Sequence, residues 1–339
     1  MGRRGPVDWR NWAVLLVSGV LVVAVLGVAE LWLRTSDRGP AAVERAGRYT
    51  RPSEAMGWGP VPGITARSRK VRGEDVLYDV AYAFDPAGRR IVPDEPGQAY
   101  AKFLLFFGGS NTFGEGLEAE DSLPRQTARH LAGVRAYNYA YRGYGPQHLL
   151  ARLESTDLRA EVEEPEGVAV YVLPGFHLHR LFGSSRTMSW VDRLPYYREE
   201  EGRLVRDGFY QTTRPMYAWS MKSIGRSRLL RRLGIAWPLR FTDTHRALAC
   251  RLFAQARDDL DRQLPSVDLV VALHPSGQDQ DWSCLEPAGI ATIDLRSAWA
   301  GVPVDELTIP GDGHVNARGN ELLGRELARA LEPLLVARQ

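Results

Sequence analysis

Apolar stretches of strand length alternate with amphipathic stretches from residue 99 onward, and this alternation predicts the fold. The strand-like stretches are 99–107, 134–141, 167–174, 267–275 and 288–295. The stretches with helical spacing of apolar positions are 122–132, 146–155, 244–264 and 316–335. Apolar strands separated by helices are typical of a parallel sheet that is buried on both faces. We therefore expect an α/β fold with three layers, α/β/α, around a mostly parallel sheet.

A long uncharged stretch lies before this region, at residues 13–29, and its apolar character extends to Leu33. A helix of about 20 apolar residues spans a bilayer, and arginines and tryptophans flank this one, as is common at membrane boundaries. We expect residues 1–12 to be cytoplasmic, 13–33 to be a transmembrane anchor, and the remainder to be periplasmic or extracellular. The alternative is a cleaved signal peptide, since Gly27 and Ala29 fit a small-x-small cleavage site, although the apolar run is long for one.

Two further segments fall outside the alternating pattern. Residues 34–98 begin with an Arg-, Gly- and Pro-rich part and contain a probable hairpin at 75–92, so we interpret them as a juxtamembrane connector. Within the main domain, 99–339, the stretch 184–240 holds seven Trp and Tyr residues around a second predicted hairpin and is interpreted as an insertion. Its aromatic faces could stack on sugars or cover acyl chains, or they could only fill the insertion's own core.

The overall composition limits the classes of partner. The net charge is +2 and acidic residues are spread among basic ones, so the chain lacks the one-sided basic stripe typical of nucleic-acid binding. There is no phosphate-binding P-loop and no complete dinucleotide loop, so no cofactor is expected. Cys250 and Cys284 could form a disulfide or remain two buried thiols. His177 and His179 form a His-x-His pair, but without a third ligand nearby we expect no metal.

Candidate chemistry centres on Ser110 in "FFGGSNTFGEG", where a buried strand ends on two glycines. Ligand sites on parallel sheets lie at the carboxyl ends of the strands, and Ser110 follows such an end. A serine nucleophile needs a base, an acid that orients the base, and donors for an oxyanion. His314, in "PGDGHVNARGN", is the best candidate base because Asp312 lies two residues before it, with His274 in reserve.

Three sequence blocks together resemble the SGNH, or GDSL-type, hydrolases. "FFGGSNTFGEG" resembles the nucleophile block, "YNYAYRGYGPQ" resembles the block with the oxyanion glycine, and "GDGHVNARGN" resembles the last block. The resemblance covers roughly residues 100–339 and implies an SGNH-type, flavodoxin-like fold. It implies that Ser110, Asp312 and His314 are catalytic, and that the amides of Ser110 and Gly143 form the oxyanion hole.

This chain departs from the family pattern at three places. Gly109 replaces the family's Asp, the last block reads Asp-x-His instead of Asp-x-x-His, and His177 in "PGFHLHR" replaces the oxyanion asparagine. The shorter Asp-x-His spacing is similar to that of polysaccharide O-acetyltransferases and of membrane-anchored members. A histidine can donate a hydrogen bond, so His177 is the expected third donor.

The resemblance implies an extracytoplasmic serine esterase without a cofactor, acting on an ester, expected to be O-acetyl, of a carbohydrate or envelope component. An O-acyltransferase with the same triad is the first alternative. A non-catalytic binding module of an envelope or export complex, and a lipid esterase with the insertion as an apolar lid, are the others. The sequence leaves the oligomeric state open.

Overall fold

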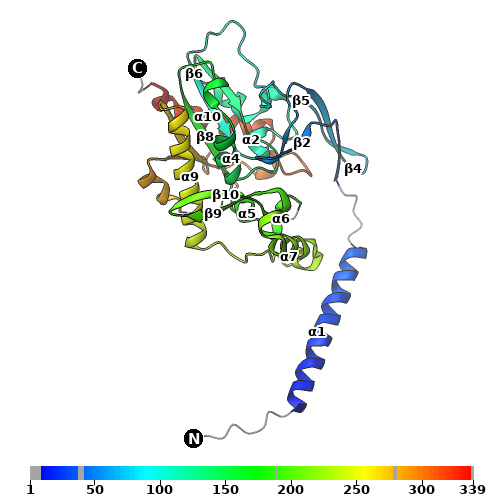
Figure 1. Cartoon of the computed structure of the whole chain (residues 1–339). Coiled ribbons are helices and arrows are strands. Elements are labelled where there is room, and N and C mark those ends of the chain that lie inside the picture. Colours follow the sequence, from blue (N-terminus) through cyan, green and yellow to red (C-terminus); the bar gives the residue numbers. More distant parts are fainter. Residues whose placement is uncertain (1–8, 37–41, 188, 278–280, 337–339) are drawn as a thin grey trace.

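The computed structural model describes residues 9–36, 42–187, 189–277 and 281–336, and its centre is a five-stranded parallel sheet (Figure 1). The strand order is β12-β11-β8-β6-β7, with each neighbouring pair parallel. The strands are β6 (Lys102–Phe107), β7 (Val134–Asn138), β8 (Glu166–Leu173), β11 (Val267–Leu273) and β12 (Ala291–Asp294). Four of them lie inside a stretch that the apolar pattern assigned to a strand, and β8 begins one residue before its stretch, so the predicted three-layer α/β/α fold is confirmed.

Helices cover both faces of this sheet. On one face lie α4 (Pro146–Ser155) and α9 (Asp243–Gln263), and on the other lie α3 (Leu123–Ala128) and α10 (Ala317–Val336). Side chains alternate along β6, so that Phe103, Leu105 and Phe107 belong to the first core. Leu104 and Phe106 belong to the second. This two-sided burial is the reason that β6 reads as a continuous apolar run.

Residues 42–83 are a folded layer rather than a simple connector. The strands β1 (Ala42–Ala46), β4 (Thr65–Arg72) and β5 (Asp75–Ala83) form an antiparallel sheet, and β2 (Thr50–Ser53) pairs with β3 (Gly57–Pro60). The hairpin expected at 75–92 is only partly formed. β5 pairs with the preceding strand β4, and the residues after β5 contribute the isolated bridge Phe84–Arg90. An aromatic cluster packs this layer against the main domain: Tyr49, Trp58, Tyr82, Phe84, Phe113 and Tyr141.

The insertion contains the second predicted hairpin, now formed by β9 (Pro195–Glu200) and β10 (Arg203–Phe209). Three helices follow it: α6 (Tyr210–Thr213), α7 (Pro215–Arg226) and α8 (Arg228–Arg232). The side chain of Tyr210 is buried and donates a hydrogen bond to the carbonyl of Leu181, which ties the insertion to the main domain.

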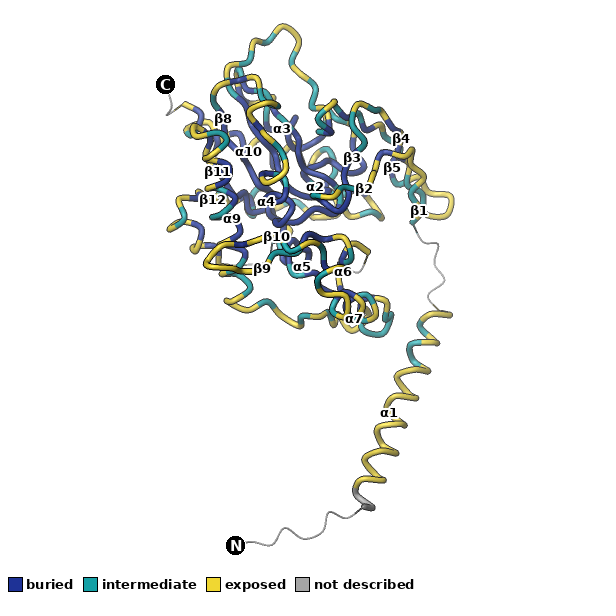
Figure 2. Tube along the Cα trace, in the orientation of Figure 1, coloured by how far each residue is buried: buried dark blue, intermediate teal, exposed yellow. Residues whose placement is uncertain are grey.

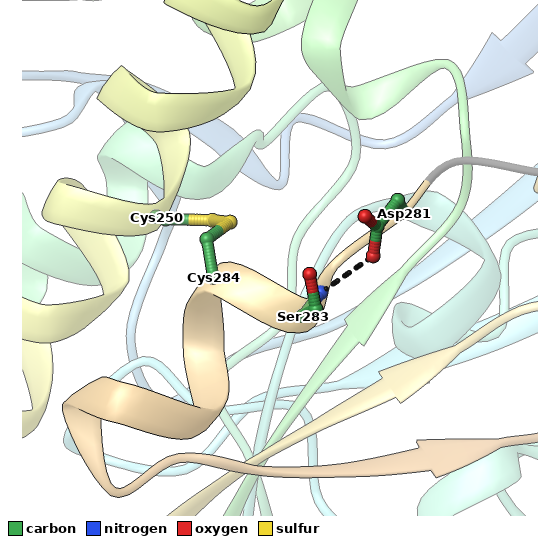
Figure 3. Close-up of a disulfide and its surroundings, with 4 residues drawn as sticks. All are labelled: Cys250, Asp281, Ser283 and Cys284. Carbon is green, nitrogen blue, oxygen red and sulfur yellow. Dashed lines mark hydrogen bonds between the residues drawn. A yellow bond between two sulfur atoms is a disulfide. The ribbon is translucent and has the colours of Figure 1, made fainter.

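The two cysteines form a disulfide between α9 and the short helical segment Ser283–Ala288 (Figure 3). Beside it, the Asp281 carboxylate accepts a hydrogen bond from the Ser283 amide at 2.9 Å. Of the two states that the sequence left open for Cys250 and Cys284, the structure has the bonded one.

The first helix, α1 (Trp9–Ser36), extends away from the rest of the chain (Figure 1). Its part from Trp12 to Ser36 is long and apolar enough to cross a membrane, and its surface is exposed nearly throughout (Figure 2). The span expected at residues 13–33 lies inside this helix.

Candidate active site

Ser110 lies at the carboxyl edge of the sheet, as the first residue of the short helix α2 (Ser110–Phe113) directly after β6. It is 4% exposed. The backbone reaches this position through Gly108, which has a φ of 152°, and a Cβ there would overlap the hydroxyl oxygen of Thr112. A glycine is therefore required to turn the chain sharply from the strand into the helix that begins with the serine.

Two backbone amides in these loops donate no hydrogen bond within the described part of the chain. Among the described residues, no acceptor takes the amide hydrogens of Ser110 or Gly143. Gly143 has a φ of 80°, and a Cβ at this position would lie 2.9 Å from Cζ2 of Trp58. Trp58 is fixed by its hydrogen bond to the carbonyl of Arg142 at 2.9 Å, so a side chain at position 143 would meet a fixed ring. Unpaired amides of this kind are the groups from which oxyanion holes are built.

Asp312 and His314 form a carboxylate–imidazole pair. The Asp312 side chain is fully buried, and one of its oxygens makes a short hydrogen bond with Nδ1 of His314. The other oxygen accepts a hydrogen bond from the ammonium group of Lys70, on β4. Burial alone would raise the pKa of Asp312, but the hydrogen bonds and charges of His314 and Lys70 outweigh it and hold this pKa below its usual range. An ionised Asp312 keeps the hydrogen on Nδ1, which leaves Nε2 as the basic nitrogen.

The His314 loop lies against the Ser110 loop at two points. Nε2 of His314 is 3.4 Å from a carboxylate oxygen of Glu115, five residues after the serine. The amide of Val315 points to the side-chain oxygen of Asn111 at 3.5 Å. The hydroxyl of Ser110 is not hydrogen bonded to His314 or to any other described residue. Serine and histidine thus lie on facing loops, with Glu115 as the immediate neighbour of the basic nitrogen.

Behind Glu115 lies a chain of paired charges, of which Glu115 is buried and Arg142 and Glu44 are partly buried. Arg142 donates to Glu115 at 2.8 Å and to both carboxylate oxygens of Glu44, on β1, at 2.6 and 2.8 Å. Burial by itself would raise the pKa of Glu44, but the hydrogen bond and charge of Arg142 lower it to about 2. One guanidinium therefore joins two carboxylates, one from β1 and one from the loop that begins with Ser110.

The other side of Ser110 is bounded by α5 (His177–Leu181). A Cβ on Gly109, where the resembling family has Asp, would overlap Nη1 of Arg180 and lie 2.7 Å from Nε2 of His177. Arg180 is 6% exposed, and this Nη1 donates to the carbonyl of Tyr144 at 2.6 Å and to Nε2 of His177 at 3.2 Å. The glycine at position 109 therefore leaves the space that the Arg180 guanidinium occupies.

The hydrogen bonds of His177 define its tautomer. Burial, and then the charge of Arg180, hold the pKa of His177 well below its usual value, so the ring is neutral. A guanidinium can only donate, so Nε2 is the acceptor and Nδ1 carries the hydrogen, facing the hydroxyl of Tyr171 at 2.8 Å. The ring nitrogen beside Gly109 therefore has no hydrogen to offer to an oxyanion.

The remaining histidine candidates have other partners. His179 faces the hydroxyl of Ser184 at 2.9 Å, away from His177, and no cluster of three metal-binding side chains occurs among the described residues. His274 is buried at the end of β11, hydrogen bonded to Ser276.

Aromatic residues of the insertion line a separate cavity of about 390 Å³. Neither Ser110 nor His314 lines it. Its wall includes Leu181, at the end of α5, and Gln147, which donates to the backbone carbonyl of Arg180. The lining residues include Phe182, Tyr196, Tyr197, Tyr210, Tyr217 and Trp237.

Four residues around the candidate site were not predicted from the sequence: Lys70, Glu115, Arg142 and Arg180. Glu115 lies inside the quoted serine block, and Lys70 is one of only three lysines in the chain. Neither fact indicates a position in the site, because the contacts of both with the His314 loop join residues far apart in the sequence.

Comparison with known proteins gives matches in structure only. No family model and no curated protein matches the sequence. Similar solved structures include an acetyl xylan esterase from the rumen bacterium Butyrivibrio proteoclasticus, with 11% identity, a TM-score of 0.42, and coverage of 73% of this chain and 67% of that one. An acetyl-xylooligosaccharide esterase from Geobacillus stearmophilus has 13% identity, a TM-score of 0.38, and coverage of 68% and 94%. A member of the lipolytic G-D-S-L family from Veillonella parvula has 14% identity, a TM-score of 0.37, and coverage of 70% and 100%.

Proposed function

We propose that this chain is a serine ester hydrolase with Ser110 as nucleophile, His314 as base and Asp312 as the acid that orients it. The observation that carries the proposal is the pair formed by the buried Asp312 carboxylate and the partly exposed His314, whose loop lies against the loop that begins with Ser110. The free amides of Ser110 and Gly143 support it, since an oxyanion needs such donors at the nucleophile. A short acyl ester, such as O-acetyl on a carbohydrate or envelope component outside the cytoplasm, is the proposed substrate, by analogy with the resembling family.

The reaction would proceed in two halves. Nε2 of His314 takes the hydroxyl proton of Ser110 as the oxygen attacks the ester carbonyl, and the two amides bind the oxyanion. The protonated His314 then gives this proton to the departing alcohol oxygen as the ester C–O bond breaks, which leaves an acyl-serine. Water attacks the acyl-serine in the same way and releases the carboxylic acid. If a sugar hydroxyl replaces water, the same residues perform an acyl transfer.

We assign the third oxyanion donor to Arg180 in place of His177. Nε2 of His177 accepts a hydrogen bond and cannot donate, whereas the guanidinium beside it is cationic and has only donors. Burial lowers the pKa of Arg180 to about 10, which leaves the group charged at neutral pH. His177 would then be a positioning residue, which holds Nη1 of Arg180 against the Ser110 loop.

A non-catalytic binding module is the second candidate, and one observation favours it. The basic nitrogen of His314 faces Glu115 at 3.4 Å, and Ser110 is not hydrogen bonded to it. Catalytic hydrogen bonds are often long before substrate binds, so this arrangement is also compatible with an enzyme.

Labelling of the full chain with a fluorophosphonate probe distinguishes the two candidates. The hydrolase should be labelled, and Ser110→Ala and His314→Ala should abolish the labelling. Ser223→Ala, which changes an exposed serine on α7, is the matched control and should be labelled like the wild type. A folded wild-type protein that does not react would favour the binding module. Turnover of p-nitrophenyl acetate with and without a sugar acceptor would then separate hydrolysis from transfer.

A further inference from the structure

The segment from residue 208 to 242 combines two unusual surface properties. It contains seven basic residues and no acidic residue, in a chain whose net charge is only +2. It also exposes large apolar side chains, with Met216 72%, Trp219 64% and Leu239 70% exposed. The basic residues are Arg214, Lys222, Arg226, Arg228, Arg231, Arg232 and Arg240. The exposed apolar residues, which we call the apolar face, are Met216, Trp219, Leu233, Ile235, Trp237 and Leu239.

The apolar face is part of a fixed structure. Met216 and Trp219 belong to α7, whose inner side is buried through Ala218 and Met221. The loop after α8 is held by paired hydrogen bonds between Ser185 and Trp237, at 2.8 and 2.9 Å. An exposed apolar patch with polar residues around it is typical of a surface that binds a partner or a membrane.

The apolar helix α1 determines the position of this surface relative to a bilayer. Glu30 is the first charged residue after the apolar run 13–29, so in a spanning helix it lies at the boundary between hydrocarbon and headgroups. Its carboxylate accepts hydrogen bonds from the Ser227 hydroxyl at 2.9 Å and from the Arg228 and Leu229 amides at 3.0 and 2.9 Å. The start of α8 is therefore held at the level of the headgroups, and α7 lies on the side of the folded part from which α1 extends (Figure 1).

We propose that residues 214–240 dock on the surface of the bilayer that α1 spans, with the apolar face among the acyl chains and the arginines at anionic phospholipid headgroups. This proposal rests on α1 being inserted, and not on the ester hydrolase activity. Trp219 and Trp237 are of the residue type that prefers the membrane interface, and basic residues beside an apolar face are typical of segments that bind anionic membranes. The docked segment would hold the folded part in one orientation against the lipid.

The test uses the full chain in nanodiscs of phosphatidylcholine, with or without phosphatidylglycerol. Single cysteines replace Leu233 or Leu239 and carry a nitrobenzoxadiazole fluorophore, and both native cysteines are in the disulfide and do not react. Val304→Cys is the matched control, since Val304 is also exposed and lies outside the segment. We expect blue-shifted emission, and quenching by doxyl lipids, at 233 and 239 but not at 304.

The charge part of the proposal is tested by reversing two arginines. Arg231→Glu with Arg232→Glu should remove the increase in quenching that phosphatidylglycerol causes at position 239. The matched control is Arg325→Glu with Arg329→Glu, two exposed arginines on α10, which should leave that increase unchanged.

Three results would overturn the proposal. Labels at 233 and 239 that emit and quench like the label at 304 would show that the segment stays in water. A blue shift without quenching by doxyl lipid would mean that protein, such as a second copy, covers the face. Failure of the full chain to enter nanodiscs would remove the insertion of α1 on which the docking depends, and it would leave the fluorophosphonate result unaffected.

Discussion

The two sides of Ser110 differ in how their charges are balanced. On the acid–base side, Asp312 lies between Lys70 and His314, and Glu115 is paired with Arg142, so each charge has an opposite partner. On the proposed oxyanion side, no carboxylate of the described residues forms an ion pair with Arg180, which is buried and donates to the carbonyl of Tyr144 and to Nε2 of a neutral His177. Paired charges fix the tautomers and orientations of the side chains that carry them. A buried cation without an ionic partner is stabilised when it binds an anion. We therefore expect the acid–base side to position the catalytic side chains and the proposed oxyanion side to bind negative charge.

The largest effect is expected from Asp312→Asn, which removes the charge from the centre of the balanced side. The amide would favour the wrong tautomer of His314, and in other triads this change lowers kcat on the order of 10⁴-fold. Hydrolysis of p-nitrophenyl acetate and the rate of fluorophosphonate labelling should fall together. The matched control is Asp305→Asn, at an exposed carboxylate in the segment before the last loop, which should retain the wild-type rate. Equal rates for both variants would contradict the assigned role of Asp312.

The next largest effect is expected from a change of Arg180, on the proposed oxyanion side. Removal of one oxyanion donor costs about 100- to 1000-fold in kcat, so Arg180→Met should lower kcat by this amount with a smaller change in KM. Arg186→Met, at an exposed arginine nearby, is the matched control.

Gly109→Ala tests the same role of Arg180 without replacing Arg180 itself. The new methyl group would overlap Nη1 of Arg180 and displace the guanidinium. The double variant with Arg180→Met should therefore be little slower than Arg180→Met alone, because both changes remove the same interaction. Fully additive losses would count against a common role.

Two other buried histidines, His148 on α4 and His274 after β11, should make stability depend on pH. Burial, and then the charge of Arg180, lower the pKa of His148 to about 3, and burial lowers that of His274 to about 3. The unfolded chain takes up protons below about pH 6.5, whereas these folded histidines do not, so stability falls as the pH falls from 7 to 5. Each histidine contributes about 2 kcal/mol to this loss at pH 5.

Thermal unfolding between pH 7 and pH 5 measures this dependence. His148→Gln should make the slope of Tm against pH shallower, even if it lowers Tm at every pH. His130→Gln is the matched control, because His130 is exposed, and it should keep the wild-type slope. A slope that His148→Gln leaves unchanged would show that this ring is not a neutral buried group.

The sequence predicted the features that depend on residues close together in the chain. It did not predict the contacts between residues far apart in the chain. The strands and helices of the main sheet follow from apolar periodicity, which β6 and α10 show within a few residues. The proximity of His314 to Asp312 could also be predicted, since both lie in one short loop. Lys70 reaches Asp312 across 242 residues, and no local pattern marks that contact. The hairpin predicted at 75–92 is only partly formed, because β5 pairs with the preceding strand β4, a pairing that the sequence did not predict.

The smallest effect is expected from Lys70→Met, and it tests whether the N-terminal layer belongs to the balanced side of the site. Lys70 supplies one of two cationic or hydrogen-bonding partners of Asp312, and His314 keeps the carboxylate oriented when Lys70 is lost. We expect kcat to fall about tenfold, equivalent to roughly 1.4 kcal/mol, with KM nearly unchanged. Lys102→Met is the matched control, since this lysine binds the carbonyl of Leu335 at the opposite edge of the sheet. A loss as large as that of Asp312→Asn would mean that the layer formed by β1, β4 and β5 is as necessary for the triad as the carboxylate itself. No loss would mean that the layer only covers the site, and that the balance of charge around Asp312 is complete without it.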